Sequence, residues 1–367
     1  MADLHNQALY GCNYEQISNG GLGIQYHITA KCDQICKHCY LINSDDYEKQ
    51  INDEMSYEII VALIDEIYDF ISKYNVSATL AITGGDPILS SSFFDILEYI
   101  QKYKHKINVT IAGNPYHIDS NVAKKMKNLN VNQYQVSLDG LEKTHDLFRR
   151  KGSFKDTIQA LKVLHDNGIV ANVMYTVSKQ NYKEVIPLIK YLEELNIVDN
   201  FAFDRMIPIG NSKSSELEII PIEEYKRLLY DVYKYEVLNK VKMEIYKKDN
   251  LWKPLLNDLG LTNPFNNLNS KMLTGCSAGL RTVSILSDGT IYACRRLEIP
   301  IGKYPERAFE DIYVNNQFQK KYLNYNLNKA SSCFSCKLNA FCRGCLAMKN
   351  AVTESIYGKD PNCWRVS

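Results

Sequence analysis

The stretch Lys31-Cys-Asp-Gln-Ile-Cys-Lys-His-Cys-Tyr40 brings three cysteines together within eight residues. It places Cys32, Cys36 and Cys39 in a C-x3-C-x2-C spacing, directly after an alternating apolar segment at residues 24–28 that predicts a strand. Iron–sulfur clusters usually take four cysteine ligands, so a three-cysteine loop leaves one iron with an open position. Because an open position lets a metal site take part in chemistry, the stretch predicts a reactive iron–sulfur centre.

The chain around this loop alternates short apolar strands with helical periods. Strand–helix units joined by right-handed crossovers form a parallel sheet, here open or curled into a partial barrel, and ligands bind at the carboxyl ends of its strands. The cysteine loop follows the first strand and lies at such an end. We expect strands at residues 24–28, 78–83, 108–112, 133–138, 170–177 and 200–207, and helices at 54–74, 93–103, 120–127, 154–167 and 183–195.

Composition and hydrophobic periodicity divide the chain into four segments. Residues 1–21 form an arm, residues 22–210 the partial (β/α)6 barrel, and residues 211–272 a largely helical bridge. Residues 273–367 are rich in cysteine, with short strands and turns, which predicts a small fold held by metal rather than by a large core.

Composition narrows the function classes. The net charge of +1 argues against a nucleic-acid partner, since such proteins normally carry a basic excess. Residues 1–10 show no signal peptide, and the longest apolar run, residues 59–64, is too short to span a membrane. A cytoplasmic protein follows, and there eleven cysteines favour metal ligation over disulfides.

A second motif, Thr83-Gly-Gly-Asp-Pro87, follows the second predicted strand. Adjacent glycines let the backbone approach a ligand closely, although such a turn by itself is an ordinary loop. Together with the cysteine loop it resembles the radical S-adenosylmethionine (radical SAM) superfamily. The resemblance implies that Gly84, Gly85 and Asp86 contact the amino group of the methionine moiety. Asp86 stands where that family has Glu, and His38 where it prefers an aromatic ring.

The same resemblance assigns residues near the fourth strand. Ser137 would contact the ribose or carboxylate of S-adenosylmethionine, and Arg149 would donate to its methionine carboxylate. Arg150 is the alternative one position along. Asp139 is equally well explained as a turn residue or a helix N-cap. Asn114, after the third strand, is a weaker candidate for this site and is better explained as a turn residue.

The C-terminal segment carries a second cysteine set of seven residues. Four of them, at positions 333, 336, 342 and 345, would suffice for a zinc knuckle, but the other three would then have no role. The spacing resembles the SPASM extension of radical SAM enzymes, which carries two auxiliary [4Fe-4S] clusters. The resemblance assigns Cys276, Cys294 and Cys345 to the first auxiliary cluster, and Cys333, Cys336, Cys342 and Cys363 to the second.

This assignment departs from the family pattern in two respects. Two residues separate Cys342 from Cys345, where the family often has three. No cysteine between Cys39 and Cys276 can provide a fourth ligand to the first auxiliary cluster, so its last iron would be open or capped by another group. Cys12 has no assigned role and is more typical of a buried small hydrophobe.

The resemblance implies an enzyme with three [4Fe-4S] clusters that cleaves S-adenosylmethionine reductively. The resulting 5′-deoxyadenosyl radical would abstract hydrogen from a ribosomally made precursor peptide, forming a thioether or C–C cross-link. An electron donor such as flavodoxin or ferredoxin would serve it. Because Cys32 stands near the start of the chain, a leader peptide would be recognised by residues 1–20, by the bridge at 211–272, or by a separate leader-recognition protein.

Other functions remain open at this stage. Sulfatase maturases carry an Asp base directly after the second auxiliary cysteine, but here Arg295 follows Cys294, which argues against that function. Arg295 and Arg296 either bind a substrate carboxylate or pair with surface acids. Members of the haem pathway share the patterns Cys342-Arg-Gly-Cys345 and Asp360-Pro-Asn-Cys363. An iron–sulfur electron carrier or a zinc-binding module is the non-enzyme alternative, against which the barrel and its glycine turn count.

Overall fold

The computed structural model describes residues 21–261, 275–323, 332–333, 335–338 and 341–365. Ten strands form one sheet in the order β10-β9-β8-β1-β2-β3-β4-β5-β6-β7. The strands are β1 (Leu22–Thr29), β2 (Ala78–Gly84), β3 (Ile107–Ala112), β4 (Val131–Ser137), β5 (Val170–Val177), β6 (Asn200–Arg205), β7 (Glu244–Tyr246), β8 (Thr282–Ile285), β9 (Thr290–Cys294) and β10 (Leu297–Lys303).

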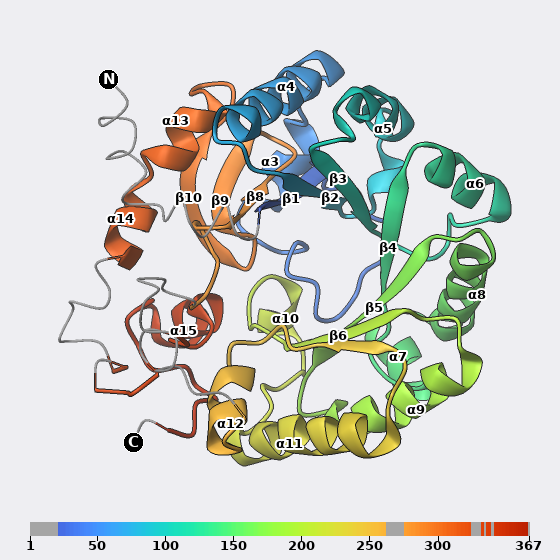
Figure 1. Cartoon of the computed structure of the whole chain (residues 1–367), viewed down its shortest axis with the longest axis vertical. Helices are drawn as coiled ribbons and strands as arrows, with labels where there is room; N and C mark the ends of the chain where they lie inside the picture. Colours follow the sequence, from blue (N-terminus) through green and yellow to red (C-terminus); the bar gives the residue numbers. More distant parts are fainter. Residues whose placement is uncertain (1–20, 262–274, 324–331, 334, 339–340, 366–367) are drawn as a thin grey trace.

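The sheet is parallel from β8 through β1 to β7, and antiparallel between β8, β9 and β10. It curls around a central space, with most helices on its outer face (Figure 1). The helices are α3 (Tyr47–Asn52), α4 (Tyr57–Lys73), α5 (Phe93–Ile100), α6 (Ser120–Asn128), α7 (Glu142–Phe148), α8 (Ser153–Asp166), α9 (Val185–Leu195), α10 (Asn211–Ser214), α11 (Ile222–Asn239), α12 (Trp252–Asp258), α13 (Phe309–Val314), α14 (Gln317–Leu323) and α15 (Leu346–Thr353).

The core lies between the sheet and its helices. Apolar residues recur along α4 with helical spacing, so Leu63, Ile64 and Ile67 are all buried against the strands. At the end of α4, Phe70 contacts the rings of Phe309 and Tyr313 in α13, at centroid distances of 5.7 and 5.2 Å. The cysteine-rich segment therefore shares its core with the barrel.

All six predicted strands and five helices of the barrel are present, with ends shifted by a few residues. The mixed α/β class with a parallel sheet is thereby confirmed. Two features of the sheet were not predicted. The three-residue strand β7 is too short to show a period, and β8 pairs in parallel with β1, so that Gly23 lies opposite Thr282. The bridge contributes α11 where a helix was expected.

No helix in the described parts of the chain is both long and apolar enough to cross a membrane. The N-terminal arm up to residue 20, including Cys12, lies outside the described residues.

Candidate active site

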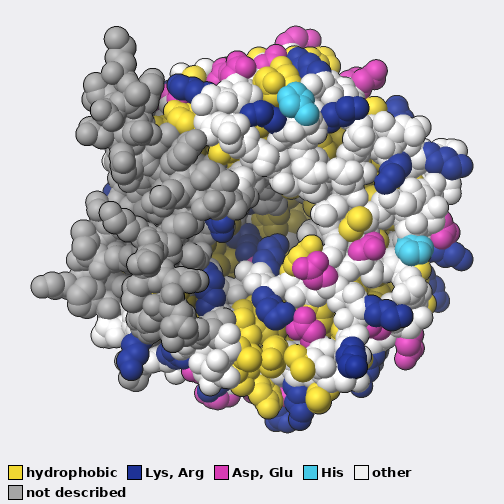
Figure 2. Space-filling model, in the orientation of Figure 1, with side chains coloured by type: hydrophobic (Ala, Val, Ile, Leu, Met, Phe, Trp, Pro, Cys, Tyr) yellow, Lys and Arg dark blue, Asp and Glu magenta, His cyan; other side chains and the backbone are white. Residues whose placement is uncertain are grey.

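A cavity of about 740 Å³ occupies the middle of the curled sheet. Figure 2 shows it as a hollow near the centre of this face, with Lys and Arg side chains on its wall. Three cysteines of the first set and three of the second line this one space, which we call the central cavity. They are Cys32, Cys36, Cys39, Cys276, Cys294 and Cys345.

The glycine turn lies directly against the cysteine loop. The Gly85 N–H donates to the Thr29 carbonyl at 3.0 Å, and the Asp86 N–H to the Lys31 carbonyl at 2.8 Å. A Cβ atom on Gly84 would lie 2.1 Å from the Thr29 oxygen, and one on Gly85 would lie 2.1 Å from the Lys31 oxygen. The approach of the two backbones therefore requires glycine at both positions.

Polar side chains surround the thiols of the loop. Burial raises the pKa of Cys36 to about 11, and the nearby Arg149 guanidinium opposes this, with its Nη1 3.4 Å from Sγ. The Asn114 amide lies 3.4 Å from the Cys32 sulfur. Asn114, which the sequence made a weaker candidate, better explained as a turn residue, thus contacts a predicted ligand. Ser137, at the end of β4, also lines the central cavity.

Asp139 fixes the position of Arg149. Its carboxylate accepts from Arg149 Nε at 2.7 Å and from the Thr176 N–H at 2.9 Å. Burial alone would raise the pKa of Asp139, but the Arg149 charge lowers it to about 2. The N-cap interpretation is wrong, because the residue before α7 is Leu141. Arg150 points elsewhere, stacking on the Tyr116 ring at 3.5 Å.

His38 completes this group. Its ring packs against Phe148 at a centroid distance of 5.7 Å, so it fills the aromatic slot with an apolar contact. Burial lowers its pKa to about 4, and Asp139, 3.4 Å away, opposes that shift. The imidazole is therefore neutral at neutral pH.

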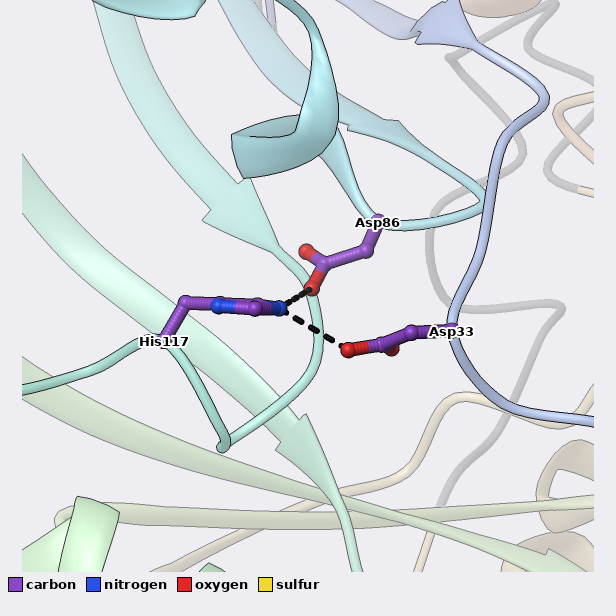
Figure 3. Close-up of side chains that lie close together, drawn as sticks. All are labelled: Asp33, Asp86 and His117. Carbon is purple, nitrogen blue, oxygen red and sulfur yellow. Dashed lines mark hydrogen bonds and ion pairs between the residues drawn. The ribbon is translucent and has the colours of Figure 1, made fainter.

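A second polar group holds the loop from the side of β2 and β3. His117 Nε2 lies 2.8 Å from Asp33 Oδ2 and 3.9 Å from Asp86 Oδ2, and the three side chains converge (Figure 3). Asn114 Nδ2 also donates to Asp33 at 2.7 Å. Burial raises the pKa of Asp86 to about 6. The Asp86 side chain thus faces His117, while its backbone faces the loop.

The cysteines at 276, 294 and 345 come from three separate segments. The pKa of Cys276 is raised by burial and by the neighbouring Cys294, and that of Cys345 by burial, Asp204 and Cys276. Such mutual effects operate only over short distances. Burial disfavours the charge of Arg296, but Asp204, at 2.6 Å, and the thiols of Cys345 and Cys294 raise its pKa.

A buried ionic network joins β6 to the C-terminal segment. Arg205 pairs with Asp249 at 2.7 Å and with Asp360 at 2.6 Å, and also donates to Asn362 at 2.9 Å. Asp360 in turn accepts from the Cys345 N–H at 2.8 Å. Sequence reasoning missed Arg205, which ends β6, and Asp249, which follows β7, since a charged residue at either position has no distinctive pattern.

Comparison with known proteins matches both cysteine-bearing regions. The Radical SAM superfamily profile covers residues 26–192, and that of SPASM, an iron–sulfur cluster-binding domain, covers residues 276–346. The chain belongs to the radical SAM superfamily. It is an enzyme of the SPASM-containing type, as the sequence resemblance predicted.

Two curated relatives of this radical SAM chain span nearly its full length. The Fe-coproporphyrin III synthase of Methanosarcina barkeri is 26% identical, over 93% of this chain and 87% of its own. The cysteine-type anaerobic sulfatase-maturating enzyme of Clostridium novyi is 24% identical, over 90% of each chain. Among solved structures, Streptococcus suis SuiB bound to the precursor peptide SuiA has a TM-score of 0.73 at 18% identity, covering 92% of this chain and 74% of its own. At this identity, the similarity shows that the two chains share a fold.

The residues of this radical SAM chain suit iron–sulfur clusters. All ten described cysteines are free thiols, the donor type such clusters take. The resemblance assigns four of these thiols to a second auxiliary cluster. Among the four, the pKa of Cys342 is raised mainly by burial and also by the neighbouring Cys363. The Cys336 N–H donates to the Cys333 carbonyl at 3.0 Å.

Arg295 differs from the expectation of a surface ion pair. It is buried and pairs with Asp46 at 3.3 Å. It therefore lies away from solvent, whereas Arg296 lines the central cavity.

Proposed function

We propose that this enzyme cleaves S-adenosylmethionine reductively and uses the 5′-deoxyadenosyl radical to abstract hydrogen from a precursor peptide. The product would contain a thioether or C–C cross-link, whose formation from the substrate radical releases one electron and one proton; the auxiliary clusters would accept the electron. One observation carries the proposal: two groups of three cysteines, each one thiolate short of a complete four-iron site, line a single cavity. A substrate in that cavity would lie between both groups. The fold shared with SuiB, whose structure includes a precursor peptide, supports a peptide substrate.

The proposal gives the chain's own residues definite roles. Cys32, Cys36 and Cys39 would hold a cluster that supplies one electron for the cleavage. The backbone of Gly84 and Gly85 would meet the amino group of S-adenosylmethionine. Asp86, whose side chain faces His117, would help only through its backbone.

Two further side chains would fix the rest of the molecule. Arg149, held by Asp139, would donate to the methionine carboxylate, and Ser137 would contact the ribose or the carboxylate. The wall of the central cavity would exclude water from the reacting centre.

The C-terminal cysteines would hold two auxiliary clusters. Cys276, Cys294 and Cys345 would bind the first, and Cys333, Cys336, Cys342 and Cys363 the second. This gives three [4Fe-4S] clusters in all, within a domain spanning residues 273–367. The proposed partners are an electron donor such as flavodoxin or ferredoxin and a separate leader-recognition protein, and the proposed location is the cytoplasm.

The test is to incubate the anaerobically reconstituted chain with S-adenosylmethionine and dithionite. We expect 5′-deoxyadenosine from the wild type, and none from a variant in which Cys32, Cys36 and Cys39 are alanine. The variant should keep the iron of the auxiliary sites, which serves as the folding control. A wild-type chain that contains its clusters but forms no 5′-deoxyadenosine would contradict the proposal.

A haem-pathway reaction is the second candidate. Seven basic but only two acidic side chains line the central cavity, a balance that suits a substrate with several carboxylates. The Fe-coproporphyrin III synthase relative supports this candidate. Incubating the enzyme separately with Fe-coproporphyrin III and with candidate peptides, and following the products by mass spectrometry, separates the two.

A further inference from the structure

Lys248 follows β7 and extends into the central cavity. Its side chain is exposed to this cavity. Partial desolvation by the cavity wall and the nearby Arg296 charge both lower the pKa of its ammonium group. Within the described part of the chain, no carboxylate oxygen lies within 4.0 Å of Lys248 Nζ. Its one polar contact is Met174 Sδ at 3.8 Å.

The neighbouring charges leave Lys248 uncompensated. Asp204 is the acidic group that acts on it, but Asp204 already binds Arg296 at 2.6 Å. Two cations thus share one carboxylate. Asp249, the other acidic residue of the wall, is bound by Arg205. An ammonium group that reaches into a cavity and has no carboxylate partner there is available to an anion that enters the cavity.

The position of Lys248 indicates where such an anion would lie. Lys248 lies near Cys294 of the dispersed cysteine set, and both line the cavity that also contains the Cys32 loop. We infer that Lys248, beside Arg296, binds a carboxylate of the substrate and orients it between the two cysteine groups. This rests on the proposed function, because it requires the substrate to occupy the central cavity.

Two sources could supply such a carboxylate: acidic residues of a peptide, or the carboxylate side chains of a tetrapyrrole. The probes are therefore a labelled peptide containing two glutamates, and coproporphyrin III. Each has a neutral counterpart, the glutamine peptide and the porphyrin methyl ester. Binding to the full-length, reconstituted enzyme with S-adenosylmethionine is measured without reductant, by anisotropy for the peptides and by Soret absorbance for the porphyrins.

We expect one carboxylate probe to bind the wild type more tightly than its neutral counterpart. Lys248→Gln should weaken that binding by about tenfold or more, since a charge-assisted hydrogen bond is lost. Lys248→Arg should restore part of it. Lys242→Gln replaces an exposed lysine that precedes β7 and does not line the central cavity, so this control should bind like the wild type.

The inference is overturned if neither carboxylate probe binds the wild type, or if Lys248→Gln binds the carboxylate probe as the wild type does. It is also overturned if Lys248→Gln weakens the binding of the neutral probe by the same factor. A changed electron paramagnetic resonance signal with unchanged probe binding would also overturn it, because Lys248 would then serve the cysteine site instead. Binding needs no radical, so a failure here is distinct from a failure to form 5′-deoxyadenosine.

Discussion

The two groups of three cysteines that face the central cavity are built in opposite ways. Cys32, Cys36 and Cys39 occupy one loop after β1, whereas Cys276, Cys294 and Cys345 come from segments up to 69 residues apart (345 − 276 = 69). The loop is held by backbone hydrogen bonds to the glycine turn. The dispersed group is linked to a buried ionic network through Cys345, whose N–H donates to Asp360, a partner of Arg205.

This difference determines which structural changes disturb each cysteine site. A loop site is disturbed by steric changes close to it, because its geometry is local. A dispersed site is disturbed by changes that loosen the segments carrying it, even at a distance from any thiol. The following predictions test this contrast.

The largest effect is expected for Arg205→Leu. It leaves Asp249 and Asp360 buried without their cation, and breaking such a pair costs about 3–5 kcal/mol. Urea unfolding measures the loss, and iron analysis should show that the C-terminal sites are depleted first. Arg227→Leu, which removes an exposed pair with Asp231, is the control and should change the stability by less than about 1 kcal/mol. Equal iron loss at the Cys32 loop would contradict the contrast.

A smaller effect is expected for Gly85→Ala. The added Cβ would collide with the Lys31 carbonyl, and the shift needed to relieve overpacking costs about 1–3 kcal/mol. We expect weaker binding of S-adenosylmethionine, measured by isothermal titration calorimetry, with the auxiliary iron retained. Gly152→Ala, whose new methyl group has nothing within 4 Å, carries only the cost of a positive φ, which Gly85 does not have, and should leave S-adenosylmethionine binding unchanged. Unchanged binding in Gly85→Ala would show that the turn does not position the ligand.

The smallest effect is expected for Arg149→Lys. The charge beside Asp139 is kept, but the planar fork is lost, which should raise the KM for S-adenosylmethionine about tenfold with little change in stability. The rate of 5′-deoxyadenosine formation at varied S-adenosylmethionine concentrations provides the measurement. Arg150→Lys, outside the cavity, should behave like the wild type. If Arg150→Lys raised this KM and Arg149→Lys did not, Arg150 would be the residue that binds the methionine carboxylate.

Much of the barrel and of the loop site follows from local sequence. The strand before Cys32 and the glycines at 84 and 85 are short-range signals, so their adjacency follows once the sheet is known to be parallel. The dispersed group was grouped by resemblance, because no local rule joins Cys276 to Cys345. Lys248 and Arg205 could not be recognised, since their significance depends on which charges lie near them after folding.

The pairing of β8 with β1 has a consequence for how the chain can be divided. Without β8, the first strand of the barrel would become an edge, with unpaired N–H and C=O groups along residues 23–26. Such edges recruit strands from other molecules and promote aggregation. A fragment that ends before β8 would therefore be prone to self-association, so the C-terminal region protects the barrel in addition to contributing cysteines to its cavity.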